Sequence, residues 1–218
     1  AEGRNCIVIG AGANAELAPA WVSAHLPALI ADDVVLAQLE SPLDAVAQAL
    51  ACGTAAGAVC ILNPAPANVA ISQALLDHVH ILTPNETEFA ALLGRHVGER
   101  IHADAVAGLD QARLHALCRT LLPDGSIIIT LGASGCFVSH ADAALRGDAH
   151  PYYRIPAEPA QVVDTTGAGD AFNGALAASL AQRPPLAFIE HVRFAGRYAA
   201  RSTECAGAAL AMPRLPVP

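Results

Sequence analysis

Short apolar runs recur along the chain, separated by segments in which the apolar positions are spaced differently. Each run is rich in valine, isoleucine or leucine and is bounded by glycine, proline, asparagine or aspartate, which is typical of buried strands. The runs predict strands at residues 6–10, 34–39, 58–62, 80–82, 126–130, 136–139 and 152–155. A last β-forming pair, Val162 and Val163, is expected to end a further strand at Asp164.

The intervening segments carry apolar residues three to four positions apart, the spacing of helices that bury one face. They predict helices at residues 42–52, 72–79, 86–93, 110–122, 171–180 and 186–202. The first helix is expected to begin with Ser41 as N-cap and Asp44 completing a capping box, and to stop at Gly53. Alternating strands and helices predict a three-layer α/β/α fold with a mostly parallel central sheet.

Polar residues follow several of the predicted strands. Glu40, Asn63, Asn85, Thr130 and Asp164 each stand at or just beyond the end of one. Because the carboxyl ends of parallel strands share one edge of an open α/β sheet, we expect these side chains to converge there.

Residues 162–174 hold the clearest candidate chemistry, reading Val-Val-Asp-Thr-Thr-Gly-Ala-Gly-Asp-Ala-Phe-Asn-Gly. A glycine turn that leads into a helix points backbone N–H groups and the positive helix end at one spot, which favours an anion. Asp170 lies beside that spot, where a carboxylate suits removal of a proton from an attacking hydroxyl. The structural alternative is a tight turn in which Asp170 only caps the helix.

A second candidate is Thr-Pro-Asn-Glu-Thr-Glu at residues 83–88. Asn85 and Glu88 are three residues apart and therefore share one face of the first helical turn. Acids at this position commonly complement the helix dipole, yet the end of a buried strand is also where α/β proteins place ligand groups.

Residues 10–15 imitate a dinucleotide-binding fingerprint, with Gly10, Gly12 and Ala15 in the required order. The fingerprint needs an acid at the end of the second strand, whereas Asp32 and Asp33 precede that strand. We therefore assign no nicotinamide site. The sequence also contains no Gly-x-x-x-x-Gly-Lys-Ser/Thr motif, which excludes a P-loop kinase.

Composition narrows the class of protein further. The 218 residues are 54% hydrophobic, carry a formal net charge of −8 and show no basic patch, so we expect neither nucleic acid nor membrane as a partner. The six cysteines form no Cys-x-x-Cys pair, and the nine histidines form no metal-binding spacing. We expect reduced thiols, a cytoplasmic location and no zinc site.

Five motifs together resemble one family. Asp-Thr-Thr-Gly-Ala-Gly-Asp at residues 164–170 resembles the C-terminal signature of the ribokinase-like (PfkB) sugar kinases. Segments 38–40, 63–67, 83–88 and 129–132 are similar to motifs of that family, and of its ribokinases in particular. Their order and spacing match along essentially the whole chain.

The resemblance implies transfer of the ATP γ-phosphate to a primary hydroxyl of a sugar, first of all D-ribose, giving D-ribose 5-phosphate. It makes Asp170 the general base, the amides of Gly167, Ala168 and Gly169 the anion hole, and Glu40 a sugar contact together with Asp170. Two alternatives remain: a family member that acts on a ketose, a nucleoside or a deoxy-sugar acid, and a catalytically inactive nucleotide-binding fragment.

The resemblance also implies ligands beyond the sugar. Nucleotide contacts are expected at Asn85, Thr130, Leu131, Gly132, Ala133, Ser134, Gly135, Gly169 and Gly196. Glu88 is expected to hold Mg²⁺ through water. A monovalent cation, K⁺, is expected at Asp164, Thr166, Ser202, Cys205, Gly207 and Ala211.

Residues 1–218 as a whole resemble the C-terminal catalytic and nucleotide-binding portion of the family domain. The N-terminal strands, the sugar motif and the lid of the family are expected to be absent from this stretch, and the complete protein is expected to form a homodimer.

Overall fold

The computed structural model describes residues 10, 12–182 and 186–214, and its centre is one six-stranded sheet. The strands lie in chain order, β1 to β6; β1 through β4 are parallel, whereas β5 and β6 run antiparallel to their neighbours. Their bounds are β1 Val34–Ala37, β2 Val59–Leu62, β3 Ile81–Leu82, β4 Ser126–Thr130, β5 Cys136–His140 and β6 Tyr152–Ile155.

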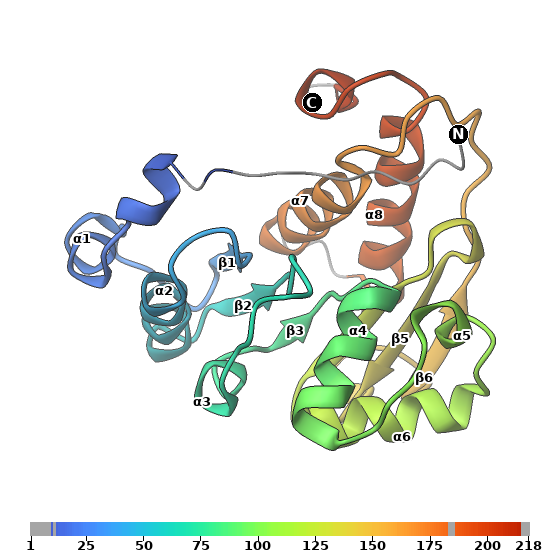
Figure 1. The fold of residues 1–218 in the computed structure, drawn as a ribbon, viewed down its shortest axis with the longest axis horizontal. Coiled ribbons are helices and arrows are strands. Elements are labelled where there is room, and N and C mark those ends of the chain that lie inside the picture. Colours follow the sequence, from blue (N-terminus) through green and yellow to red (C-terminus); the bar gives the residue numbers. More distant parts are fainter. Residues whose placement is uncertain (1–9, 11, 183–185, 215–218) are drawn as a thin grey trace.

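Helices cover both faces of this sheet (Figure 1). The α-helices are α1 Pro19–His25, α2 Leu43–Ala55, α3 Gln73–Leu76, α4 Glu86–Leu92, α5 Ala103–Val106, α6 Gln111–Leu121, α7 Ala168–Ala181 and α8 Phe188–Ser202. Short 3-10 helices lie at Gly12–Glu16, Gly132–Ser134, Ala144–Arg146 and Ala209–Ala211, and a π-helical turn, Leu93–Val97, extends α4. The predicted three-layer α/β/α fold with a mostly parallel sheet is confirmed.

Alternation along the strands divides the buried residues into two cores. Cys60 and Leu62 of β2 face the layer that contains α2, α3, α4, α5 and α6, whereas Ile61 faces the layer of α7 and α8. Ile127 and Ile129 of β4 repeat this division, with Ile128 on the opposite face. Successive side chains of a strand point to opposite faces, so a strand covered on both sides becomes apolar throughout.

The prediction of a strand that ends with Val162 and Val163 is wrong. Both side chains are mainly exposed, at 62% and 66%, and residues 156–163 contain no strand. The N–H groups of Val163 and Asp164 both donate to the carbonyl of Thr203, at 2.8 and 3.0 Å. The backbone here therefore bonds to the end of α8 instead of to a neighbouring strand.

The predicted start and stop of α2 are also wrong. The N-cap is Pro42, which offers no side-chain bond, and Asp44 accepts from the N–H of Ala45 rather than completing a capping box. Gly53 lies inside the helix, where an added Cβ would come within 2.7 Å of Cys60 Sγ. The glycine permits close packing of α2 on the sheet, and the left-handed residue that follows the helix is Gly57 (φ 76°).

The strand predicted at residues 6–10 lies, apart from Gly10, outside the described residues. The following segment forms a 3-10 helix, Gly12–Glu16, and α1 begins at Pro19. None of the helices that the structure describes combines the length and the apolar character needed to cross a membrane.

Candidate active site

The glycine turn before α7 exposes backbone donors at a helix N-terminus. Gly167 is the N-cap with φ 77°, and a Cβ there would also lie 3.1 Å from the Cβ of Ala208. The N–H of Ala168 donates to the carbonyl of Thr165 at 3.2 Å, so this amide is already engaged. Within the described part of the chain, the N–H groups of Gly167, Gly169 and Asp170 have no acceptor. Free donors at the positive end of a helix are an arrangement that favours an anion.

Asp170 lies in the same first turn of α7. Its side chain is exposed and makes no hydrogen bond to the described residues, so its carboxylate is free to meet a substrate hydroxyl. A carboxylate in reach of both a hydroxyl and an anion site can act as a general base.

Asp164 braces the turn from the other side. One carboxylate oxygen accepts from the N–H and the hydroxyl of Thr166, at 2.9 and 2.7 Å, and the other accepts from the N–H of Gly207 at 2.9 Å. The Gly207 amide and the Thr166 donors lower the pKa of Asp164 to about 2. Asp164 is therefore charged at neutral pH and links the turn to the loop after α8.

The residues predicted to bind K⁺ are only partly brought together. Thr166 and Gly207 both donate to Asp164. The buried Ser202 donates instead to the carbonyl of Ala199 at 2.8 Å. Of the other two residues predicted for this site, Ala211 is buried and Cys205 is exposed. The described residues hold no group of three or more His, Cys, Asp or Glu side chains that could bind a metal, so backbone carbonyls would have to complete a cation site around Asp164.

A cavity of about 550 Å³ opens beside the glycine turn. Ala168 and Gly169 line it on one side. Seven residues predicted to contact the nucleotide line it: Asn85, Thr130, Gly132, Ala133, Gly135, Gly169 and Gly196. The other two predicted contacts do not: Leu131 is buried and Ser134 is exposed. The volume and the mainly apolar lining suit a ligand of nucleotide size.

The loop between β4 and β5 depends on Gly135. Its φ is 82°, and a Cβ would lie 2.0 Å from the carbonyl oxygen of Ile155, so no other residue fits. The N–H of Leu131 donates to the Gly135 carbonyl at 2.8 Å and closes the loop. The loop therefore presents small residues and backbone to the cavity.

Sequence reasoning missed a large part of the cavity wall. Around the predicted Gly196, one face of α8 and its C-cap contribute further, mostly small residues at helical spacing: Val192, Ala199, Ala200 and Thr203. Phe172 of α7 and the segment after β6, Pro156 and Ala157, also line the cavity. The residues of α8 could have been found from their spacing, whereas the position of Phe172 depends on how α7 packs.

Asn85 and Glu88 form a complete capping box at the start of α4. Glu88 accepts from the N–H of Asn85 at 2.8 Å and from its side-chain amide at 2.9 Å, and the Asn85 side chain accepts from the N–H of Glu88 at 2.9 Å. Burial raises the pKa of Glu88, which the Asn85 donors partly oppose. Asn85 and Glu86 line the cavity, whereas Glu88 does not, so the predicted contact of Glu88 with Mg²⁺ stays a prediction.

Glu40 does not line the large cavity. It is exposed beyond the end of β1, and its N–H donates to the side chain of Gln38. Its neighbours Gln38 and Ser41 line a separate, smaller cavity of about 250 Å³. Its sugar contact stays a prediction.

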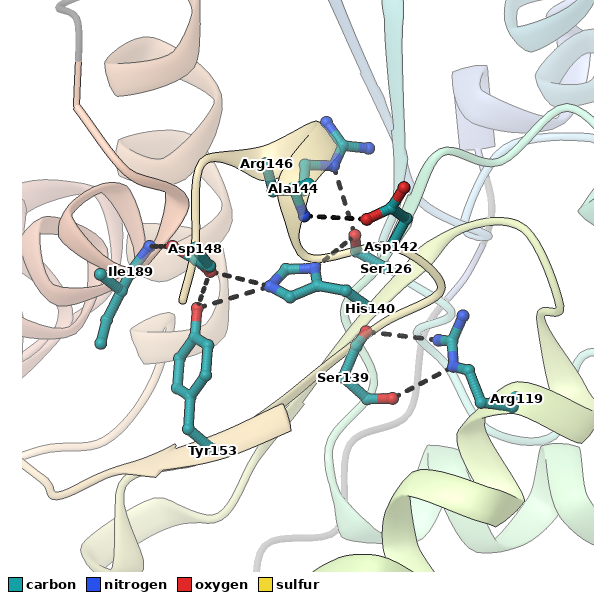
Figure 2. A network of polar contacts seen from close by, with 10 residues as sticks. All are labelled: Arg119, Ser126, Ser139, His140, Asp142, Ala144, Arg146, Asp148, Tyr153 and Ile189. Carbon is teal, nitrogen blue, oxygen red and sulfur yellow. Dashed lines mark hydrogen bonds and ion pairs between the residues drawn. The ribbon is translucent and has the colours of Figure 1, made fainter. Parts of the chain in front are cut away.

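A second polar cluster lies at the amino end of β4 (Figure 2). His140 joins Ser126 at 2.8 Å and Asp148 at 2.9 Å, in the order of a hydrolase triad, and Asp148 also accepts from Tyr153 and from the N–H of Ile189. Ser126 and His140 are 2% and 0% exposed, so no substrate can reach the hydroxyl. Burial lowers the pKa of His140. This cluster is structural: it joins β4 and β5 to the start of α8.

The fold and the site define a three-layer α/β/α protein with a nucleotide-sized cavity at the N-terminus of a helix. The chain belongs to the pfkB family of carbohydrate kinases, whose profile it matches over residues 1–215.

Individual relatives agree with this assignment. A bifunctional ribokinase/ribose-5-phosphate isomerase A of Fructilactobacillus sanfranciscensis is 38% identical over 180 residues, which are 82% of this chain and 30% of that protein. The ribokinase of Haemophilus influenzae is 34% identical over 209 residues, 96% of this chain and 62% of that protein. The structure of Arabidopsis thaliana ribokinase complexed with ribose and ATP is 28% identical, with a TM-score of 0.73, and is matched over 97% of this chain and 63% of its own. The chain thus spans less than two thirds of the length of these relatives.

Proposed function

We propose that the full-length protein transfers the γ-phosphoryl group of ATP to the primary hydroxyl of a sugar, and that the sugar is D-ribose. The observation that carries the proposal is the first turn of α7, where the free amides of Gly169 and Asp170 adjoin both the Asp170 carboxylate and the nucleotide-sized cavity. Membership of the pfkB family, ribokinase relatives and a related structure with ribose and ATP support it.

The proposed reaction uses few groups, because phosphoryl transfer depends mainly on position and on charge neutralisation. The adenosine occupies the cavity, and the phosphates extend towards the N-terminus of α7. Asp170 takes the proton of the sugar hydroxyl as its oxygen attacks the γ-phosphorus. The bond from that phosphorus to the β–γ bridging oxygen breaks, ADP leaves, and the amides of Gly169 and Asp170 offset the charge on the transferred group.

Two further residues are assigned to ions. Glu88 would hold Mg²⁺ through water, and the ion would neutralise charge on the phosphates. Asp164 would hold K⁺ with backbone carbonyls of the loop after α8, while its bonds to Thr166 and Gly207 keep the glycine turn in place.

The experiment is a sugar panel with a coupled assay for ADP release, applied to the full-length protein with ATP and Mg²⁺. D-Ribose should give the highest kcat/KM among ribose, 2-deoxyribose, fructose, a nucleoside and a deoxy-sugar acid. A higher kcat/KM for another sugar would contradict ribose as the substrate and would still support a sugar kinase. No sugar-dependent ADP release would contradict the proposal and favour a nucleotide-binding protein without catalysis.

A further inference from the structure

A buried chain of hydrogen bonds connects the first turn of α7 to the ends of β2 and β3. The side-chain amide of Asn173 donates to the carbonyl of Gly169 at 2.9 Å, and its oxygen accepts from the hydroxyl of Thr83 at 2.6 Å. The carbonyl of Thr83 accepts in turn from the side chain of Asn63 at 2.9 Å. Thr83 and Asn173 are 2% and 5% exposed, so water does not compete for these bonds.

The orientation of the Asn173 side chain follows from its partners. The Gly169 carbonyl can only accept, so the NH₂ group of Asn173 must point towards it, and the Asn173 oxygen then faces Thr83. The Thr83 hydroxyl has one proton, and the bond to Asn173 is much shorter than its 3.4 Å contact with the carbonyl of Leu62. One arrangement alone therefore satisfies all three groups.

Helix α7 does not require this connection in order to form. Asparagine is a weak helix former, and a buried amide costs stability unless its hydrogen bonds are made. Thr83 lies 90 residues away in the sequence, directly after β3 and two residues before Asn85 of the cavity. The bond thus ties the anion-binding turn to the strand edge that carries the other half of the site.

We propose that Thr83 and Asn173 are positioning residues, which fix the Gly169–Asp170 turn relative to the end of β3 so that its amides and carboxylate meet the transferred phosphoryl group. The proposal rests on the function proposed above. The two residues touch neither nucleotide nor sugar in this account and act through the Gly169 carbonyl. Their loss should therefore lower kcat more than it changes the binding of ATP.

The test compares Thr83→Val, which keeps the shape and removes the hydroxyl, with Thr83→Ser, which keeps the hydroxyl. Thr83→Val leaves a buried acceptor without its donor, and we expect kcat to fall about 5- to 50-fold while KM for ATP changes by less than about twofold. Thr83→Ser should retain most of the kcat. Ser126→Ala is the matched control, since it removes another buried hydroxyl at the amino end of β4 and should lower thermal stability without lowering kcat.

Amide hydrogen exchange gives a second reading that needs no turnover. In the first turn of α7, the N–H of Ala171 donates to the carbonyl of Gly167 at 2.8 Å, and this amide should exchange faster in Thr83→Val than in wild type. Its exchange rate should be unchanged in Ser126→Ala. If wild type shows no sugar-dependent turnover, the proposed function fails, while the exchange result still decides whether Thr83 fixes the turn. If Thr83→Val does not fold, Asn173→Asp, which cannot donate to Gly169, is measured in the same way.

Three results would overturn the proposal. The first is a kcat of Thr83→Val within about twofold of wild type in an active enzyme, a ratio too small for a lost buried bond. The second is unchanged exchange in the first turn of α7. The third is an equal loss of kcat in Ser126→Ala, because the effect would then belong to general stability.

Discussion

At the scale of single residues, Asp164 has the clearest role. It accepts three hydrogen bonds, two from Thr166 and one from Gly207, so a single carboxylate joins the glycine turn to the loop after α8. Those donors favour the charged form, which is why its pKa falls to about 2.

This pKa predicts how stability depends on acid. An aspartate in the unfolded chain has a pKa of about 3.9, so the bonds of Asp164 stabilise the fold above that pH and lose their effect as pH falls towards the folded pKa of about 2. Asp164→Asn should lower the melting temperature near neutral pH, and the gap from wild type should narrow between pH 4 and pH 2. Asp104→Asn, at an exposed position, is the control. A difference in melting temperature between Asp164→Asn and wild type that stays constant from pH 4 to pH 2 would show that the bonds of Asp164 do not depend on its charge.

Glu88 carries a prediction about magnesium. If it holds the ion through water, Glu88→Gln should shift the Mg²⁺ activation curve to higher concentration more than it changes KM for the sugar, because the amide keeps the size and loses the charge. Asp104→Asn, an exposed first-turn acid of α5, is the control. Superimposable Mg²⁺ curves for wild type and Glu88→Gln would make Glu88 a helix-capping residue only.

The residues that sequence reasoning identified are those that belong to local motifs. The glycine turn, Asp170 and the Asn85–Glu88 pair are each contained in one short segment, and their local geometry follows from that segment. Thr83 and Asn173 were missed as partners because they meet only through packing of α7 on the sheet. A local sequence pattern cannot predict a bond between two residues that are 90 positions apart in the chain.

At the scale of elements, apolar periodicity predicted most helices and strands, and single residues misled at their ends. Gly53 was interpreted as a helix stop, although α2 continues to Ala55 and the glycine is buried against Val35 and Cys60. The missing strand at Val162 and Val163 has a similar cause: two β-forming residues found no neighbouring strand to pair with. In both cases, tertiary contacts outweighed a local preference.

Two helical glycines test this explanation. Gly53→Ala would place a Cβ 2.7 Å from Cys60 Sγ and 2.9 Å from Val35 Cγ2, and overpacking of this kind costs about 1–3 kcal/mol. In Gly174→Ala nothing lies within 4 Å of the new Cβ, so the higher helix propensity of alanine should stabilise α7 by up to about 1 kcal/mol. Urea unfolding of both variants should give free-energy changes of opposite sign; stabilisation by Gly53→Ala would contradict the packing account.

At the scale of the whole molecule, the topology explains why distant motifs meet. Parallel strands in chain order bring the residues that follow β3 and β4 to one edge, where Asn85 pairs with Thr130 across an isolated bridge. The predicted convergence holds for this pair, whereas Glu40 lies apart from the large cavity and Asp164 follows no strand. Asn63 does not line the large cavity either, and its side chain donates to the carbonyl of Thr83. Alternation predicts the sheet; which strand ends share a cavity depends on the packing of α7 and α8.

Five buried or half-buried histidines give the stability of the fold a second dependence on pH. Burial lowers the pKa of His80, His96, His115, His140 and His191. Histidines of the unfolded chain have pKa values of about 6.5, so below that pH the unfolded chain binds more protons than the folded protein. The stability of the fold therefore falls as pH decreases.

The free energy of unfolding from urea titrations should therefore decrease from pH 7.5 to pH 5. His140→Gln should reduce that slope. His150→Gln, at an exposed position, leaves the five rings in place and should not reduce it. A free energy of unfolding that is constant over this interval would contradict the prediction, because it would mean that these histidines have the same pKa in the folded and the unfolded protein.

The central claim is that the first turn of α7 is the centre of phosphoryl transfer, with Asp170 as base. The most direct measurement is kcat and ATP affinity of Asp170→Asn beside wild type, in the full-length protein with its best sugar. Removal of a general base should lower kcat about 10²- to 10⁴-fold and leave ATP affinity nearly unchanged, because the cavity and the amides remain. A variant that keeps more than about a tenth of the wild-type kcat would contradict the claim, since a loss that small is below the usual contribution of a general base.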